Sequence, residues 1–88
     1  MTAALTPQTA LAWLRSLSAD VEAAAVLDAH AGVLAGDRAL GPRVAAADTT
    51  LVVARSATRM VAVRPGPAAP MRLLEADVRG ALEALEPR

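Results

Sequence analysis

Asp28 and His30 are the residues of this sequence whose types and spacing could do chemistry. An imidazole oriented by a carboxylate can act as a general base when a nucleophile lies within hydrogen-bonding distance. His30 is the only histidine, and no motif connects Ser16, Ser18 or Ser56 to it. An aspartate that opens a tight loop normally accepts a backbone N–H of its own turn. We therefore predict a hairpin turn and a chain that is not an enzyme; a small hydrolase or isomerase using Asp28 and His30 is the alternative.

Other kinds of chemical site have little support in the residue types. The chain contains no cysteine, which excludes disulfides, thiolate metal sites and thiol nucleophiles. One histidine and scattered carboxylates give too few ligands for a metal site. Gly32, Gly36 and Gly41 do not match a phosphate-binding glycine pattern and are expected in turns. We therefore expect neither a cofactor nor a metal.

The composition limits the size of the core. The 88 residues are 55% hydrophobic, but Trp13 is the only aromatic residue and much of the apolar count is alanine. A small domain with so thin a core is commonly stabilised by oligomerisation. Trp13 lies on the apolar stripe of a predicted helix, so we expect it in the core or in an interface rather than on a surface that stacks a ligand.

Charge and hydropathy argue against two classes of partner. Nine basic residues balance nine acidic ones, whereas general affinity for nucleic acid needs a concentrated positive field. The start of the chain lacks the basic region of a signal peptide, and no apolar run reaches the roughly 18 residues of a membrane span. We therefore expect no nucleic acid and no membrane as partner, and we predict a cytoplasmic location.

Helical spacing marks both ends of the chain. Thr6 offers a hydroxyl N-cap, Pro7 follows at the first helical position, and the apolar residues after it predict a helix over 7–17. A second amphipathic stripe predicts a helix over 70–85. Residues 36–48 contain two glycines and a proline, which leaves a short helix and a loop as alternatives.

Four apolar runs are typical of strands. Val21–Ala29 is apolar on both alternations, and Val33–Ala35 follows it after a loop. Thr50–Arg55 and Met60–Arg64 predict a second hairpin. The predicted order is α-β-β-(short α)-β-β-α: one α+β domain over residues 1–88, with a single antiparallel sheet of four to five strands and the terminal helices on one face. The other face would lie partly apolar and uncovered, which predicts a homodimer.

Arg55, Arg59 and Arg64 gather around the predicted second hairpin. One interpretation makes them solvated charges that keep sheet edges from aggregating. The other makes them contacts for an acidic partner or a phosphate, and charges of this kind steer a partner and set its orientation. These three arginines are our candidate partner-binding residues.

The run VEAAAVLDAHAGVLAGD (residues 21–37) resembles the opening hairpin of the roadblock/LC7 family. Members combine a short apolar strand, a turn of the Asp-x-x-Gly type and a second strand such as V-L-A. TLVVAR, MVAVR and the C-terminal amphipathic helix follow in family order, while the long central helix of the family corresponds to the shorter GDRALGPRVAAAD. The resemblance implies a roadblock- or profilin-like fold and a homodimeric, non-enzymatic scaffold. It also implies regulation of a small Ras-like GTPase, which such proteins often accompany in bacteria.

By analogy with the pairing in that family, the dimer interface would involve the region after the first hairpin and the strand at 50–55. The residues concerned are Leu34, Leu40, Val44, Leu51 and Val53. An alternative function is a small profilin-like or PAS-type module that senses a ligand held between sheet and helix. Such a module needs a pocket, and a lining of alanines tends to close rather than to leave one.

Overall fold

Two hairpins lie side by side in one antiparallel sheet. The computed structural model describes residues 5–18 and 20–85. The element order is α1 (Pro7–Leu17), β1 (Val21–Asp28), β2 (Val33–Gly36), α2 (Leu40–Ala45), β3 (Val52–Arg55), β4 (Arg59–Pro65) and α3 (Met71–Leu85). The strand order in the sheet is β2-β1-β4-β3, and every neighbouring pair is antiparallel. The predicted α+β class and element order are confirmed, with four strands.

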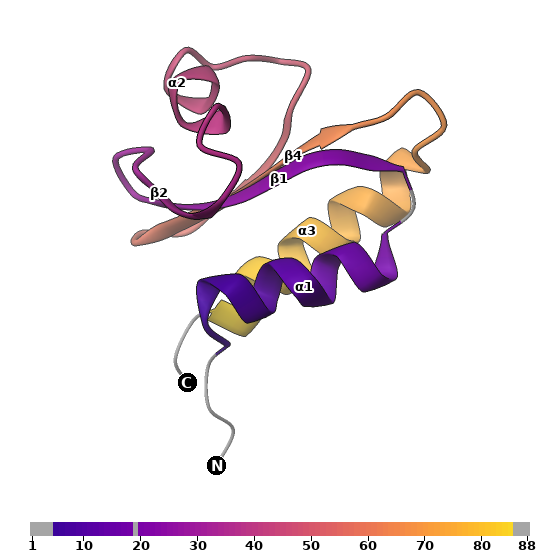
Figure 1. The fold of residues 1–88 in the computed structure, drawn as a ribbon, viewed down its shortest axis with the longest axis horizontal. Coiled ribbons are helices and arrows are strands. Elements are labelled where there is room, and N and C mark those ends of the chain that lie inside the picture. Colours follow the sequence, from indigo (N-terminus) through magenta and orange to yellow (C-terminus); the bar gives the residue numbers. More distant parts are fainter. Residues whose placement is uncertain (1–4, 19, 86–88) are drawn as a thin grey trace.

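The terminal helices α1 and α3 pack together on one face of the sheet (Figure 1). The Thr6 side chain accepts the N–H of Thr9 at 3.2 Å and caps α1. The N–H of Leu5 donates to the carbonyl of Ala84 at 2.9 Å, so the start of α1 lies near the end of α3 and the two helices run antiparallel. Between them and the sheet lies the larger core, which includes Leu14, Val26, Val61, Leu74 and Val78, all 0–1% exposed.

The opposite face of the sheet is covered in part by α2 (Figure 1). We expected this face to lack a covering element, and that expectation is wrong. The sheet presents Ala23, Ala25 and Ala62 on this side. Because these side chains are short, a helix of six residues can approach closely enough to bury Leu40 and Val44. Of the two alternatives that the sequence left open for residues 36–48, the structure has the short helix, flanked by turns.

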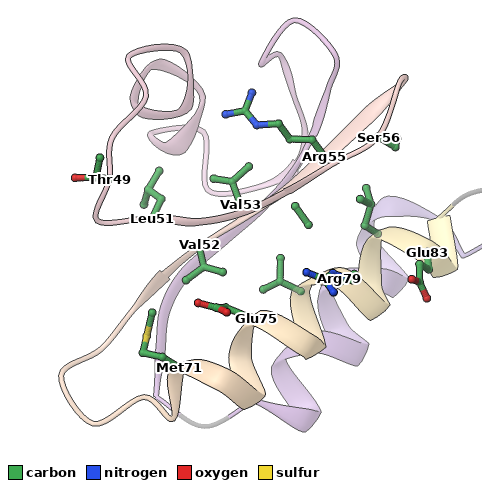
Figure 2. Close-up of a pocket in the computed structure, with 13 residues that line it drawn as sticks. Thr49, Leu51, Val52, Val53, Arg55, Ser56, Met71, Glu75, Arg79 and Glu83 are labelled. Atoms are coloured by element: carbon green, nitrogen blue, oxygen red, sulfur yellow. The ribbon is translucent and has the colours of Figure 1, made fainter.

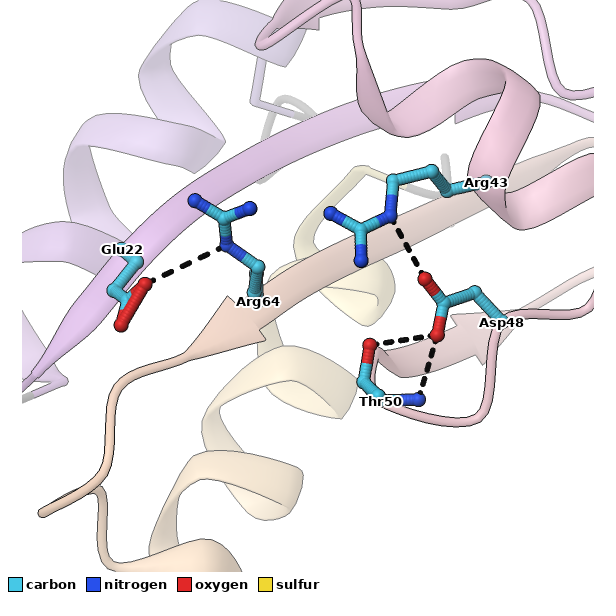
Figure 3. Close-up of polar contacts among 5 residues, drawn as sticks. All are labelled: Glu22, Arg43, Asp48, Thr50 and Arg64. Carbon is cyan, nitrogen blue, oxygen red and sulfur yellow. Dashed lines mark hydrogen bonds and ion pairs between the residues drawn. The ribbon is translucent and has the colours of Figure 1, made fainter.

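Asp48 holds the connection from α2 to β3 (Figure 3). Its carboxylate accepts the Arg43 Nε–H at 2.8 Å and both the hydroxyl and the backbone N–H of Thr50, at 2.6 and 2.9 Å. The hydrogen bond from the Thr50 hydroxyl is the largest of the causes that lower the pKa of Asp48 to about 2. This turn places Leu51 on the alanine-rich face, where it is buried.

Candidate functional site

Asp28 and His30 form a turn, as predicted. Asp28 Oδ1 accepts the backbone N–H of His30 at 2.8 Å and that of Gly32 at 2.9 Å. These two bonds, the one from Gly32 first, hold the pKa of Asp28 below its usual value. The carboxylate thus orients the backbone of the hairpin loop, while His30 is exposed. The prediction that the chain is not an enzyme stays a prediction.

A pair of substitutions separates the turn from a catalytic role. His30→Ala is expected to change the free energy of unfolding by less than about 0.5 kcal/mol, because the imidazole is exposed. Asp28→Ala is expected to lower the melting temperature more, because two backbone N–H groups lose their acceptor. Thermal unfolding followed by circular dichroism compares the two variants. Equal losses, or a larger loss for His30→Ala, would contradict the turn interpretation.

The three candidate arginines do not form one cluster. Arg55 ends β3 and Arg59 begins β4, so both lie beside the tip of the second hairpin. Their side chains leave the sheet on opposite faces, because residue 59 shares a face with 61 and residue 55 with 53. Arg64 lies at the far end of β4, where its Nε is 3.6 Å from Glu22 Oε2 (Figure 3). Arg55 and Arg59 therefore share the hairpin tip but not one face of the sheet, and Arg64 lies apart from both.

The five residues predicted for the dimer interface lie in three places. Leu40, Val44 and Leu51 are 1–9% exposed and pack inside the chain. Leu34 is 44% exposed on β2, and Val53 is half-buried on β3, at the opposite edge of the sheet. The five therefore do not share one surface, and Val53 and Leu34 are the two that a second copy could reach directly. The homodimer itself stays a prediction.

A groove of about 840 Å³ runs between β3 and α3 (Figure 2). Its apolar part is made by Val52 and Ala54 of the strand and Val78 and Leu82 of the helix. Charged and flexible side chains of α3 line its outer side: Met71, Glu75, Arg79 and Glu83. No residue pattern in the sequence pointed to this groove, because it depends on β3 being an edge strand with α3 alongside.

The open edge of β3 presents backbone hydrogen-bonding groups. The N–H of Ser56 donates to the carbonyl of Arg59 at 2.8 Å, which makes these two residues a hydrogen-bonded pair at the hairpin end. In an antiparallel ladder, bonded and non-bonded pairs alternate. The next pair, Arg55 with Met60, is therefore non-bonded, and so is the pair that contains Val53. The N–H and C=O groups of Val53 and Arg55 point away from β4, toward the open edge.

The other edge strand, β2, is irregular. Val26 pairs with Ala35 and Leu27 pairs with Val33, so Leu34 is an extra residue without a partner in β1. A bulge of this kind bends an edge strand and interrupts its row of backbone groups, which discourages pairing with a further strand. Of the two edges, β3 is therefore the one suited to strand addition.

The space in which a profilin-like or PAS-type module would hold a ligand is occupied by buried side chains. Between the sheet and the pair α1 and α3 lie Leu14, Val26, Val61, Leu74 and Val78, each 0–1% exposed. These contacts give the ligand-sensing alternative no support at that position.

Comparisons with protein-family models, curated proteins and solved structures gave no match to this chain. Within residues 5–18 and 20–85, no three or more histidine, cysteine, aspartate or glutamate side chains come together as a group that could hold a metal ion. In the same residues, no helix has the length and apolar character needed to cross a membrane. The fold defines the class as an α+β domain in which a groove borders the edge strand β3, and the roadblock/LC7 resemblance stays a prediction.

Proposed function

We propose that the chain is a non-enzymatic protein-interaction domain that forms a homodimer through the open edge of β3. The observation that supports this most is the outward direction of the backbone groups of Val53 and Arg55. Such groups pair readily with a strand from another chain. The adjoining groove provides apolar side chains that a partner would cover. The thin, alanine-rich core adds a reason for association.

A second copy is the occupant that matches this edge best. Two β3 strands can pair antiparallel about a two-fold axis at Ala54, so that Val53 of one copy faces Arg55 of the other. Each of these two facing pairs would exchange both of its backbone hydrogen bonds, as an isologous interface requires. The side of α3 that borders the groove carries charges of both signs, from Glu75, Arg79 and Glu83. When the α3 helices of two copies approach each other, opposite charges can therefore face one another.

Arg55→Pro and Arg55→Ala form a matched test of this pairing. The wild type and Arg55→Ala are expected to give twice the chain mass of 9.0 kDa in light scattering at micromolar concentration, and Arg55→Pro the single mass. Proline removes the N–H that faces the open edge but no bond to β4, so the monomer should keep its fold. A monomeric wild type, or a dimeric Arg55→Pro with unchanged circular dichroism, would contradict the proposal.

We further propose that the partner of the dimer is a small Ras-like GTPase in the bacterial cytoplasm. This rests on the roadblock/LC7 resemblance and on the charges of Arg55 and Arg59 at the hairpin tip. Arg59→Glu leaves the outward groups of β3 in place and is expected to weaken binding of a purified Ras-like GTPase from the source cell. Binding that is unchanged in Arg59→Glu at low and high salt would count against this partner.

A further inference from the structure

The outer side of the α1 and α3 pair carries exposed apolar side chains that neither the core nor the β3 edge uses. Trp13 is 38% exposed, Leu17 53% and Leu73 65%. Trp13 lies against α3 where that helix has a glycine: a Cβ added at Gly80 would be 3.1 Å from Cη2 of the indole. Large apolar side chains that remain exposed beside one another on a small domain mark an interaction surface.

A pocket of about 300 Å³ lies at one end of this surface. It is lined by Leu17, Ser18, Pro70, Leu73, Leu74 and Asp77. The Ser18 hydroxyl donates to Asp77 Oδ2 at 2.9 Å and orients the carboxylate. Asp77 is half-buried, and the ion pairs in the described part of the chain do not include it. A partly buried carboxylate at an apolar opening, without a cation, is placed to receive one from a partner.

We propose that this surface binds an amphipathic helix of a partner protein, with an aliphatic side chain in the pocket and a lysine or arginine against Asp77. Two antiparallel helices leave a groove along their length into which the side chains of a third helix fit. Trp13 lies against Gly80 of α3, one helical turn from Leu17 in α1, and tryptophan is among the residue types enriched at the energetic centres of interfaces. The surface is separate from the β3 edge, so this proposal holds whether or not the chain forms a dimer.

Trp13 is the only tryptophan of the chain and reports on this surface directly. The probes are two alanine-rich helical peptides of about 18 residues. Both carry two leucines one turn apart; one has a lysine a further turn along and the other a glutamate at that position. The lysine peptide is expected to move Trp13 emission to shorter wavelength and to bind at least about tenfold more tightly than the glutamate peptide.

Three variants of the full chain identify the contacts. Asp77→Asn still accepts the Ser18 hydroxyl and is expected to abolish the preference between the peptides, while Leu73→Ser weakens binding of both. Leu34→Ser, which also removes an exposed leucine but on β2, is the matched control and should change neither. Absence of binding, equal binding of the two peptides, or a preference that survives Asp77→Asn would overturn the proposal. Trp13 emission that changes with protein concentration alone would overturn it in favour of a second copy.

Discussion

Leu14→Ala is expected to lower the free energy of unfolding by about 2–5 kcal/mol. Leu14 is fully buried in the core between the sheet and α3, and α1 contributes only Leu11 and Ala10 beside it. The residual cavity would lie in a close-packed core of leucine, valine and alanine side chains, which relax only in part toward the space left by the missing leucine. Because small domains have total stabilities near the low end of about 5–15 kcal/mol, much of that margin would be lost.

Urea unfolding followed by circular dichroism measures this loss. Leu73→Ala is the matched control, since it makes the same chemical change at a side chain that is 65% exposed on α3. Its effect should stay within about 0.5 kcal/mol, because an exposed leucine buries little area and alanine favours helix. Equal losses in the two variants would contradict the core described for α1.

Gly36→Ala is the second substitution with a large expected effect. Gly36 has φ +95°, a conformation that side chains rarely adopt, and an added Cβ would lie 2.3 Å from the carbonyl oxygen of Ala24 and 2.9 Å from the Cα of Ala25. Both neighbours are backbone atoms of the central strand β1, so they cannot move aside without disturbing the sheet. We expect a loss of at least about 2 kcal/mol.

Gly80→Ala is the control for this glycine. There the added Cβ meets only the edge of the Trp13 side chain at 3.1 Å, and alanine within α3 gains about 1 kcal/mol in helix propensity. The variant should therefore be close to the wild type in urea unfolding. A Gly36→Ala chain as stable as Gly80→Ala would show that the end of β2 is not held as described.

Local patterns in the sequence predict most of the elements, because local contacts decide them. The bounds 7–17 agree with α1, where the Thr6 cap and Pro7 act within one turn. The strand expected from Thr50 begins instead at Val52. The reason is that the Thr50 hydroxyl and N–H both donate to the Asp48 carboxylate and so form a turn before the strand. A count of β-branched residues does not detect such a turn.

Features that depend on how the elements assemble could not be predicted in the same way. Leu40 and Val44 cover the second face because Ala62 of β4, far along the sequence, lies beside Ala23 and Ala25 of β1 in the sheet. The groove and the open edge depend on the strand order, which places the second hairpin beside β1 through β4 and leaves β3 outside. Hairpin patterns alone fit other orders equally well, and for that reason the predicted interface combined residues from both edges and from the interior.

Amide hydrogen exchange at Val53 and Arg55 tests the homodimer most directly. Both N–H groups point to the open edge of β3 in the single chain, and in the proposed dimer each lies in a hydrogen bond to the partner strand. Nuclear magnetic resonance at rising protein concentration is expected to show exchange at these two amides slowing as the dimer forms. Rapid exchange at both amides across a concentration range in which the amides of the neighbouring strand β4 are protected would contradict the account.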